Sequence, residues 1–194
     1  MASIVVAGDT SGSITLAAPA VAGSNTLTLP ALTGTVLTSA SSQSAFPTGI
    51  AGTGPAFSAY ASANQTVSNS TFTKLQANTE EFDTASCYDN STNYRFTPNV
   101  AGYYQVNGSI NMTSSNNTDV LCVIYKNGSA AKWGNYATRA SFATDQGSVA
   151  SALIYCNGTT DYLELFGYIT GTGTLQFIGS QARTYFQASM VRAA

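Results

Sequence analysis

The sequence predicts an all-β protein built as a sandwich or a barrel. From residue 56 onward the chain is dense in β-branched and aromatic residues, arranged in short runs separated by Gly, Asn, Asp and Pro. No stretch shows the helical repeat of apolar positions. Many short strands with turns at regular spacing are typical of sandwiches and barrels.

Composition limits the functions that the chain can have. Charged residues make up 8% of the 194 residues, against about 25% in an average globular domain. The net charge is −2 and there is no basic patch, so we expect no nucleic-acid binding. Such weakly charged surfaces are common on extracellular and virion proteins, and on proteins that bury much surface in assembly.

The sequence contains no histidine. This excludes the Ser-His-Asp triad, the usual general base and the commonest transition-metal ligand. We therefore predict no catalytic residue and no enzyme. Cys87, Cys122 and Cys156 are widely spaced in apolar runs and are predicted to be buried free thiols. One disulfide with one free thiol is the alternative.

Residues 1–40 form a region of their own that lacks aromatic residues. Polar and apolar residues alternate over 13–16 and 26–29, which predicts short strands, and 34–38 offers a third. This is too little to bury a core in a monomer. We expect the region to wrap with other copies of itself or to dock on another protein.

Residues 41–55 are small, polar and interrupted by Gly and Pro, so they are predicted to be a linker to a domain over 56–194. Asn127-Gly128 and Asn157-Gly158 are predicted hairpin turns. The strands predicted in the domain cover residues 56–61, 72–77, 82–88, 93–97, 102–112, 119–126, 131–137, 148–156, 161–169, 174–178 and 184–191.

The most regular of these segments follows Gly102. Tyr104, Val106 and Ile110 fall on one side of the strand, which we assign to the core. The other side is polar with one aromatic ring and suits a wet or subunit-facing surface. It carries Tyr103, Gln105, Asn107 and Ser109.

The pattern Phe-x-Pro-x-x-x-Gly-x-Tyr-x-Val over 96–106 resembles the central motif of C1q-like domains, relatives of the tumour necrosis factor jelly rolls. Residues 56–60 resemble the family's opening strand. Residues 158–165 resemble its Gly-Asp-x-Val-x-Leu strand entry, with an insertion, and 185–191 resemble its closing strand, with Gln-Ala in place of Ser-Gly. The resemblance implies a ten-stranded jelly-roll β-sandwich over residues 56–194.

Three C1q-like domains pack around a threefold axis, so the resemblance also implies a homotrimer. The inner sheet would contain residues 56–61, 102–112, 148–156 and 184–191. The implied interface residues are Tyr103, Gln105, Asn107 and Ser109.

A second resemblance concerns the N-terminal region. Residues 12–19, 22–30 and 33–38 look like a repeat-like segment of bacteriophage tail-fibre and virion-appendage proteins. This implies a virion protein that binds other virion proteins through residues 1–40 and projects a C1q-like head toward the host surface. A secreted C1q-like recognition module and a capsid-decorating protein without a ligand are the alternatives. The N-terminus lacks the positive charge and apolar length of a secretory signal, and no run reaches the roughly 18 apolar residues of a membrane span.

Trp133, Asn135 and Tyr136 are candidates for binding a host-surface glycan, because Trp and Tyr can stack on a sugar while Asn bonds its hydroxyls. Arg139 follows in a predicted loop and is the next candidate. The alternative is that Trp133 is an ordinary packing residue.

The acidic residues Glu80, Glu81 and Asp83 form the one cluster that suggests a metal. Carboxylate oxygens bind hard cations such as calcium, and some C1q-like relatives hold calcium near the trimer apex. The spacing matches no EF-hand, so we favour a solvated acidic loop and predict no cofactor, with calcium as the alternative.

Overall fold

The computed structural model divides the chain into two units, residues 1–39 and 40–194. In the first unit, β1 (Ser3–Ala7) and β2 (Ser13–Ala17) form an antiparallel pair. The strands predicted at 26–29 and 34–38 lie outside the described residues. The structure describes residues 3–7, 13–17, 54–114, 116–142 and 145–194.

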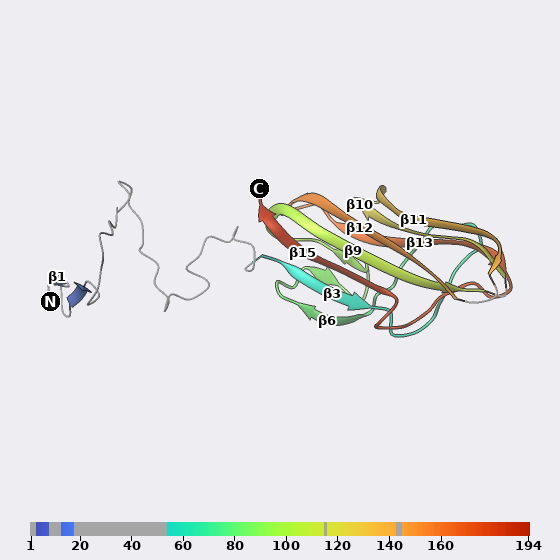
Figure 1. Cartoon of the computed structure of the whole chain (residues 1–194), viewed down its shortest axis with the longest axis horizontal. Helices are drawn as coiled ribbons and strands as arrows, with labels where there is room; N and C mark the ends of the chain where they lie inside the picture. Colours follow the sequence, from blue (N-terminus) through green and yellow to red (C-terminus); the bar gives the residue numbers. More distant parts are fainter. Residues whose placement is uncertain (1–2, 8–12, 18–53, 115, 143–144) are drawn as a thin grey trace. The chain divides into compact units, whose positions relative to one another are not determined.

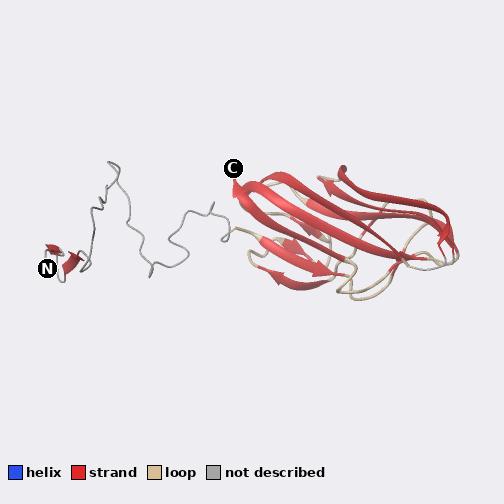
Figure 2. Cartoon of the chain, viewed as in Figure 1, coloured by secondary structure: helices blue, strands red, loops and turns tan. Residues whose placement is uncertain are grey.

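The second unit consists of two antiparallel sheets, with no helix among its described residues (Figures 1 and 2). The described residues thus contain no helix of the length and apolar character needed to cross a membrane. The seven-stranded sheet, called the β9 sheet, contains β3 (Ala56–Tyr60), β4 (Gln65–Thr66), β6 (Thr79–Asp83), β9 (Ala101–Thr113), β12 (Gln146–Asn157), β14 (Gln176–Phe177) and β15 (Tyr185–Ala193). The six-stranded sheet, called the β13 sheet, contains β5 (Thr73–Lys74), β7 (Tyr88–Asp89), β8 (Arg95–Phe96), β10 (Asn116–Lys126), β11 (Ser129–Phe142) and β13 (Leu163–Thr172).

Strand β9 is the central strand of its sheet, as Figure 1 shows. It pairs with β12 along one side and with β15 and β14 along the other. Strand β3 pairs with β15 and with β6, which lies at the sheet edge. The four strands predicted to share one sheet therefore do so.

The core lies between the two sheets. Tyr104, Val106 and Ile110 are fully buried in it, which confirms the alternation predicted for β9. Its aromatic centre is Phe57 of β3, whose ring stacks on Tyr88 with centroids 4.5 Å apart and on Phe96 at 4.6 Å, and meets the edge of Phe186 at 5.1 Å.

One of the two predicted hairpins is correct. Asn127 and Gly128 have φ values of 53° and 76° and join β10 to β11 in a tight turn. The second prediction was wrong, because β12 and β13 belong to different sheets. There the Asn157 side-chain oxygen accepts hydrogen bonds from the backbone N–H groups of Thr159, Thr160 and Asp161, each at 3.0 Å. The asparagine thus stabilises a turn that crosses between the sheets.

Two further predictions need correction. Strand β11 extends to Phe142, so Arg139 lies in a strand and not in a loop. The strand predicted over 82–88 is interrupted, because the Asp83 carboxylate accepts hydrogen bonds from the N–H groups of Ala85 at 3.2 Å and Tyr88 at 2.7 Å. An aspartate that binds backbone ahead of itself favours a turn over a continuous strand.

A bulge in β11 connects the two sheets. Leu121 pairs with Tyr136 and Val123 with Trp133, which leaves one extra residue in β11. The N–H of Cys122 is bound instead by the Ser148 hydroxyl of β12 at 2.8 Å. That hydroxyl in turn donates to the Asn135 carbonyl oxygen at 2.7 Å.

We expect Ser148→Ala to lower the free energy of unfolding by about 1–3 kcal/mol, because it leaves the buried Cys122 N–H without its acceptor. Urea unfolding monitored by circular dichroism measures the change. Ser129→Ala, which removes an exposed hydroxyl at the start of β11, is the control and should cost clearly less. Equal losses in the two variants would contradict this role of Ser148.

Cys87, Cys122 and Cys156 are free and buried, as predicted. Burial raises the pKa of all three thiols, that of Cys156 to about 11. They are therefore protonated and unreactive at neutral pH, and they serve as small apolar core residues.

Candidate functional site

The outward side of the β9 sheet exposes large apolar side chains on three neighbouring strands, β12, β9 and β15. Register places Tyr155 opposite Tyr103, and their ring centroids are 5.6 Å apart. The exposed fractions of the side chains in this group, which we call the apolar face, lie between 41% and 54%. Its members are Tyr103, Val149, Leu153, Tyr155 and Val191.

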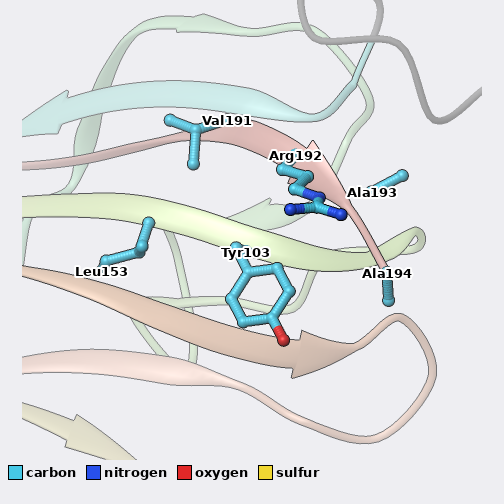
Figure 3. Close-up of a pocket in the computed structure, with 6 residues that line it drawn as sticks. All are labelled: Tyr103, Leu153, Val191, Arg192, Ala193 and Ala194. Carbon is cyan, nitrogen blue, oxygen red and sulfur yellow. The ribbon is translucent and has the colours of Figure 1, made fainter.

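One end of the apolar face is hollowed into a pocket of about 530 Å³ (Figure 3). Tyr103, Leu153 and Val191 contribute its apolar walls from three strands, and Arg192 lies beside Tyr103. The last residue, Ala194, lies at its margin. A pocket of this kind accepts an apolar side chain from a partner more readily than a charged one.

The four residues predicted at a subunit interface have different surroundings. Tyr103 belongs to the apolar face, whereas Gln105 and Asn107 are half-buried and share hydrogen bonds with Ser151 at 3.0 and 2.7 Å. Ser109 is buried within its own subunit and donates to the Arg183 carbonyl oxygen at 2.7 Å. Its hydroxyl therefore has a structural role, and the interface itself stays a prediction.

Sequence reasoning missed most of the apolar face. Val149, Leu153 and Tyr155 alternate with Ala150 and Ile154, which are buried in the core. Strand β12 is thus apolar on both sides, which is the signal of a strand covered on both faces. That signal was available in the continuous apolar run of residues 152–156.

A group of aromatic side chains lies on the outward side of the β13 sheet. Leu121 and Val123 of β10 alternate with core residues and therefore point away from the core. Both are nevertheless almost fully buried. Aromatic side chains of neighbouring segments surround them, and we call these side chains the aromatic patch. Its members are Phe72, Tyr125, Trp133, Tyr136 and Tyr168.

The aromatic patch contains two of the four predicted glycan-binding residues. Trp133 is 62% exposed and Tyr136 is 58% exposed. Asn135 does not join them: at the bulge, its side-chain oxygen accepts a hydrogen bond from the Val149 N–H of β12 at 2.6 Å. Arg139 lies in β11, but its side chain is outside the described residues.

Hydrogen bonds fix the end of the patch formed by Tyr136. Its hydroxyl donates to one carboxylate oxygen of Asp119 at 2.9 Å, and Thr170 donates to the other at 2.6 Å. The bond to Asp119 raises the pKa of Tyr136, so the hydroxyl remains protonated and keeps its donor role at neutral pH. The ring is therefore held in one orientation.

The three carboxylates considered for calcium do not converge. Glu81 accepts hydrogen bonds from Ser58 at 2.6 Å and Gln181 at 2.7 Å, which lower its pKa. Asp83 is bound by backbone N–H groups, and Glu80 lies opposite Ala59 in the register of β3 and β6. These residues form a strand and not the predicted loop. The part of the chain that the structure describes holds no group of three or more acidic, cysteine or histidine residues arranged for a metal.

The carboxylate of Asp161 is buried near the β10–β11 turn. It forms an ion pair with Lys126 at 2.8 Å and accepts hydrogen bonds from the Asn127 side chain at 2.7 Å and the Asn157 N–H at 3.0 Å. The bond from Asn127 and the interaction with Lys126 lower the pKa of Asp161. Asp161 therefore connects the turn at Asn127 to the turn at Asn157, which is a structural role.

We expect the Asp161 carboxylate to make the free energy of unfolding depend on pH. Because its pKa is lowered in the folded state, its contribution is complete above the ordinary carboxyl pKa of about 3.9 and is lost as pH falls through the lowered pKa. The stability difference between wild type and Asp161→Asn should thus be constant near neutral pH and shrink below about pH 4. Urea unfolding from pH 2.5 to 7 measures it. Asp145→Asn, at an exposed pair with Arg183, is the control, and a difference independent of pH would contradict the assignment.

Comparison with known proteins concerns the fold. No protein-family model and no curated protein sequence matches the chain. Among solved structures, the globular domain of a zebrafish complement 1qA protein matches 72% of this chain and 99% of its own, with a TM-score of 0.54 and 12% identity. The Eiger TNF of S. frugiperda matches 73% of this chain and 95% of its own, with a TM-score of 0.56 and 10% identity. Murine APRIL matches 71% and 99%, with a TM-score of 0.54 and 8% identity.

The fold is a C1q/TNF-like jelly roll. The structure also explains two residues of the motif by which the sequence resembles C1q-like domains. A Cβ atom on Gly102 would lie 2.6 Å from the Arg192 carbonyl oxygen, so only glycine allows β9 and β15 to approach here. The hydroxyl of the buried Tyr104 donates to the Val100 carbonyl oxygen at 2.7 Å and fixes the turn before β9.

Proposed function

We propose that this protein is a homotrimeric structural protein of a bacteriophage virion. Residues 1–40 attach it to other virion proteins, and the C1q-like domain projects as a head that binds the host surface. It is not an enzyme and carries no cofactor in this proposal. The fold and the exposed apolar face support the proposed trimer. The N-terminal sequence supports the proposed location in a virion.

The observation that carries the trimer is the apolar face. In a single copy, Leu153, Tyr155 and Val149 are each exposed by 42% or more on one strand. Several large apolar side chains exposed on one sheet face are unusual on a monomer and typical of subunit interfaces, where aromatic residues are enriched. The pocket beside Tyr103 can receive a side chain of the neighbouring subunit. Three copies arranged around an axis cover the face in each of them.

The low charge content agrees with this arrangement. Only 8% of residues are charged, and the described charged side chains that border the apolar face include Arg192 and Lys126, whose ammonium lies 5.6 Å from the centre of the Tyr155 ring. Interface cores are depleted in charged residues. A sheet that packs against its own core on one side and a partner on the other needs few charges.

The virion assignment is tested by locating the protein. Phage particles should be purified from a lysate of the producing host on a density gradient and analysed by mass spectrometry and by immunogold electron microscopy. We expect peptides of this chain in the particle fraction and gold label on an appendage. Recovery of the chain only from the culture medium, separate from particles, would contradict the proposal and favour a secreted recognition module.

A further inference from the structure

We propose that a row of uncharged polar side chains across the β9 sheet fixes how the three subunits align in the trimer. The row crosses four neighbouring strands, and register pairs each member with the next. Its members, which we call the polar row, are Ser151, Asn107, Gln187 and Ser58. The inference rests on the proposed function and deepens it: the apolar face supplies the affinity between copies, and the polar row selects one alignment of them.

The position of the polar row is the first argument. Asn107 lies in the central strand β9 and Gln187 in the adjacent β15, so both are at the middle of the sheet. Two positions along β12 in either direction from Ser151, the same outward side carries Val149 and Leu153 of the apolar face. A partner that covers the apolar face on both sides of the polar row therefore covers the row as well.

The unused hydrogen-bonding capacity of two amides is the second argument. The Asn107 side-chain oxygen accepts hydrogen bonds from Gln105 at 3.3 Å and Ser151 at 2.7 Å. The Gln187 side-chain oxygen accepts one from Ser58 at 3.5 Å. Among the residues that the structure describes, neither amide nitrogen donates to a partner. Both side chains are half-buried, so these N–H groups meet solvent in a single copy.

Covering these amides makes association depend on alignment. An arrangement of copies that gives the N–H groups acceptors keeps the full affinity of the apolar face, whereas any other arrangement buries them unpaired at a cost in free energy. A single buried asparagine selects the register and the number of strands in coiled coils in this way. Apolar contacts are non-directional and make no such selection. The polar row therefore discriminates between assemblies that the apolar face alone would accept.

The chemistry of the polar row favours a second copy of this chain as the partner. A primary amide presents two donors and an acceptor, so it is complementary to another primary amide. The row contains no charged residue and offers no ion pair to a charged partner. The carboxylate that adjoins it, that of Glu81, already accepts hydrogen bonds from Ser58 at 2.6 Å and Gln181 at 2.7 Å. Copies related by a threefold axis supply the same amides to one another.

The double variant Asn107→Leu/Gln187→Met tests this selection, because it keeps the branching of each side chain and removes the amide. We expect the variant to stay associated through the apolar face but to sediment as several species, where the wild type gives one. Sedimentation velocity measures the masses, and circular dichroism confirms the fold. A single species with the wild-type mass would overturn the inference. A folded monomer would also overturn it, since the polar row would then supply the affinity itself.

Gln187→Glu tests whether the polar row is covered in the assembly. The change preserves the size of the side chain and adds a carboxylate, which destabilises an interface that buries it without a partner. We expect folded monomers at a protein concentration at which the wild type is fully trimeric. Gln76→Glu and Gln76→Met are the matched controls at an exposed position between β5 and β6, and both should leave a single trimeric species. An unchanged mass of Gln187→Glu would place the row outside the interface and refute the inference.

The wild-type protein, measured in parallel, separates this inference from the proposed trimer. A wild-type mass of 20.1 kDa would contradict the trimer, and the polar row with it. A trimeric wild type together with an equally homogeneous double variant would leave the trimer standing and reject only the role of the polar row.

Discussion

Phe57→Ala is expected to lower the free energy of unfolding by about 3–5 kcal/mol. The Phe57 side chain is fully buried and contacts Tyr88, Phe96 and Phe186 at the centre of the core. Its removal loses the transfer free energy of the ring and leaves a cavity that three large neighbours cannot close. Because single domains have net stabilities of about 5–15 kcal/mol, a loss of this size removes a large share of the total.

Guanidinium unfolding, followed by circular dichroism at fixed protein concentration, measures this loss. Phe82→Ala is the matched control, since Phe82 lies on the edge strand β6 and is 51% exposed. It should change stability by about 0.5 kcal/mol or less. Equal losses in the two variants would contradict the placement of Phe57 at the core centre.

Leu153→Asp is expected to convert the trimer into folded monomers. In the proposed assembly Leu153 is covered by a neighbouring subunit, and a carboxylate buried there without a partner costs about 3–5 kcal/mol. The threefold axis repeats this cost at every interface. In the isolated domain Leu153 is 54% exposed, so the fold itself should tolerate the change.

Sedimentation velocity of the variant measures its mass, and circular dichroism confirms its fold. Thr138→Asp adds the same charge at an exposed position of β11, on the other sheet, and should leave the trimer intact. A Leu153→Asp protein that retains the wild-type mass would show that the apolar face is not the interface.

Local patterns predicted much of the fold because they report local chemistry. Alternation in β9 identified Tyr104, Val106 and Ile110 as core, and Asn127-Gly128 gave the correct turn, since both depend on residues close in sequence. Asn157-Gly158 carries the same turn signal but joins different sheets. There a Cβ on Gly158 would lie 2.3 Å from the Ala101 nitrogen, a tertiary contact that the dipeptide does not reveal.

The exposed faces were harder to predict for a related reason. Asn135 was grouped with its neighbours Trp133 and Tyr136, but the bulge in β11 turns it toward Val149. The sequence did not identify Leu153 as an exposed residue. Strand β12 is apolar on both sides, and its sequence alone does not show which side faces the core. The side that meets solvent depends on the pairing of β12 with β9, a contact between segments far apart in sequence.

The mass of the purified protein in solution, measured by light scattering at neutral pH, tests the central claim most directly. The proposed homotrimer predicts three times the chain mass of 20.1 kDa, unchanged when the protein is diluted. A mass of 20.1 kDa would contradict it and leave the apolar face exposed on a monomer.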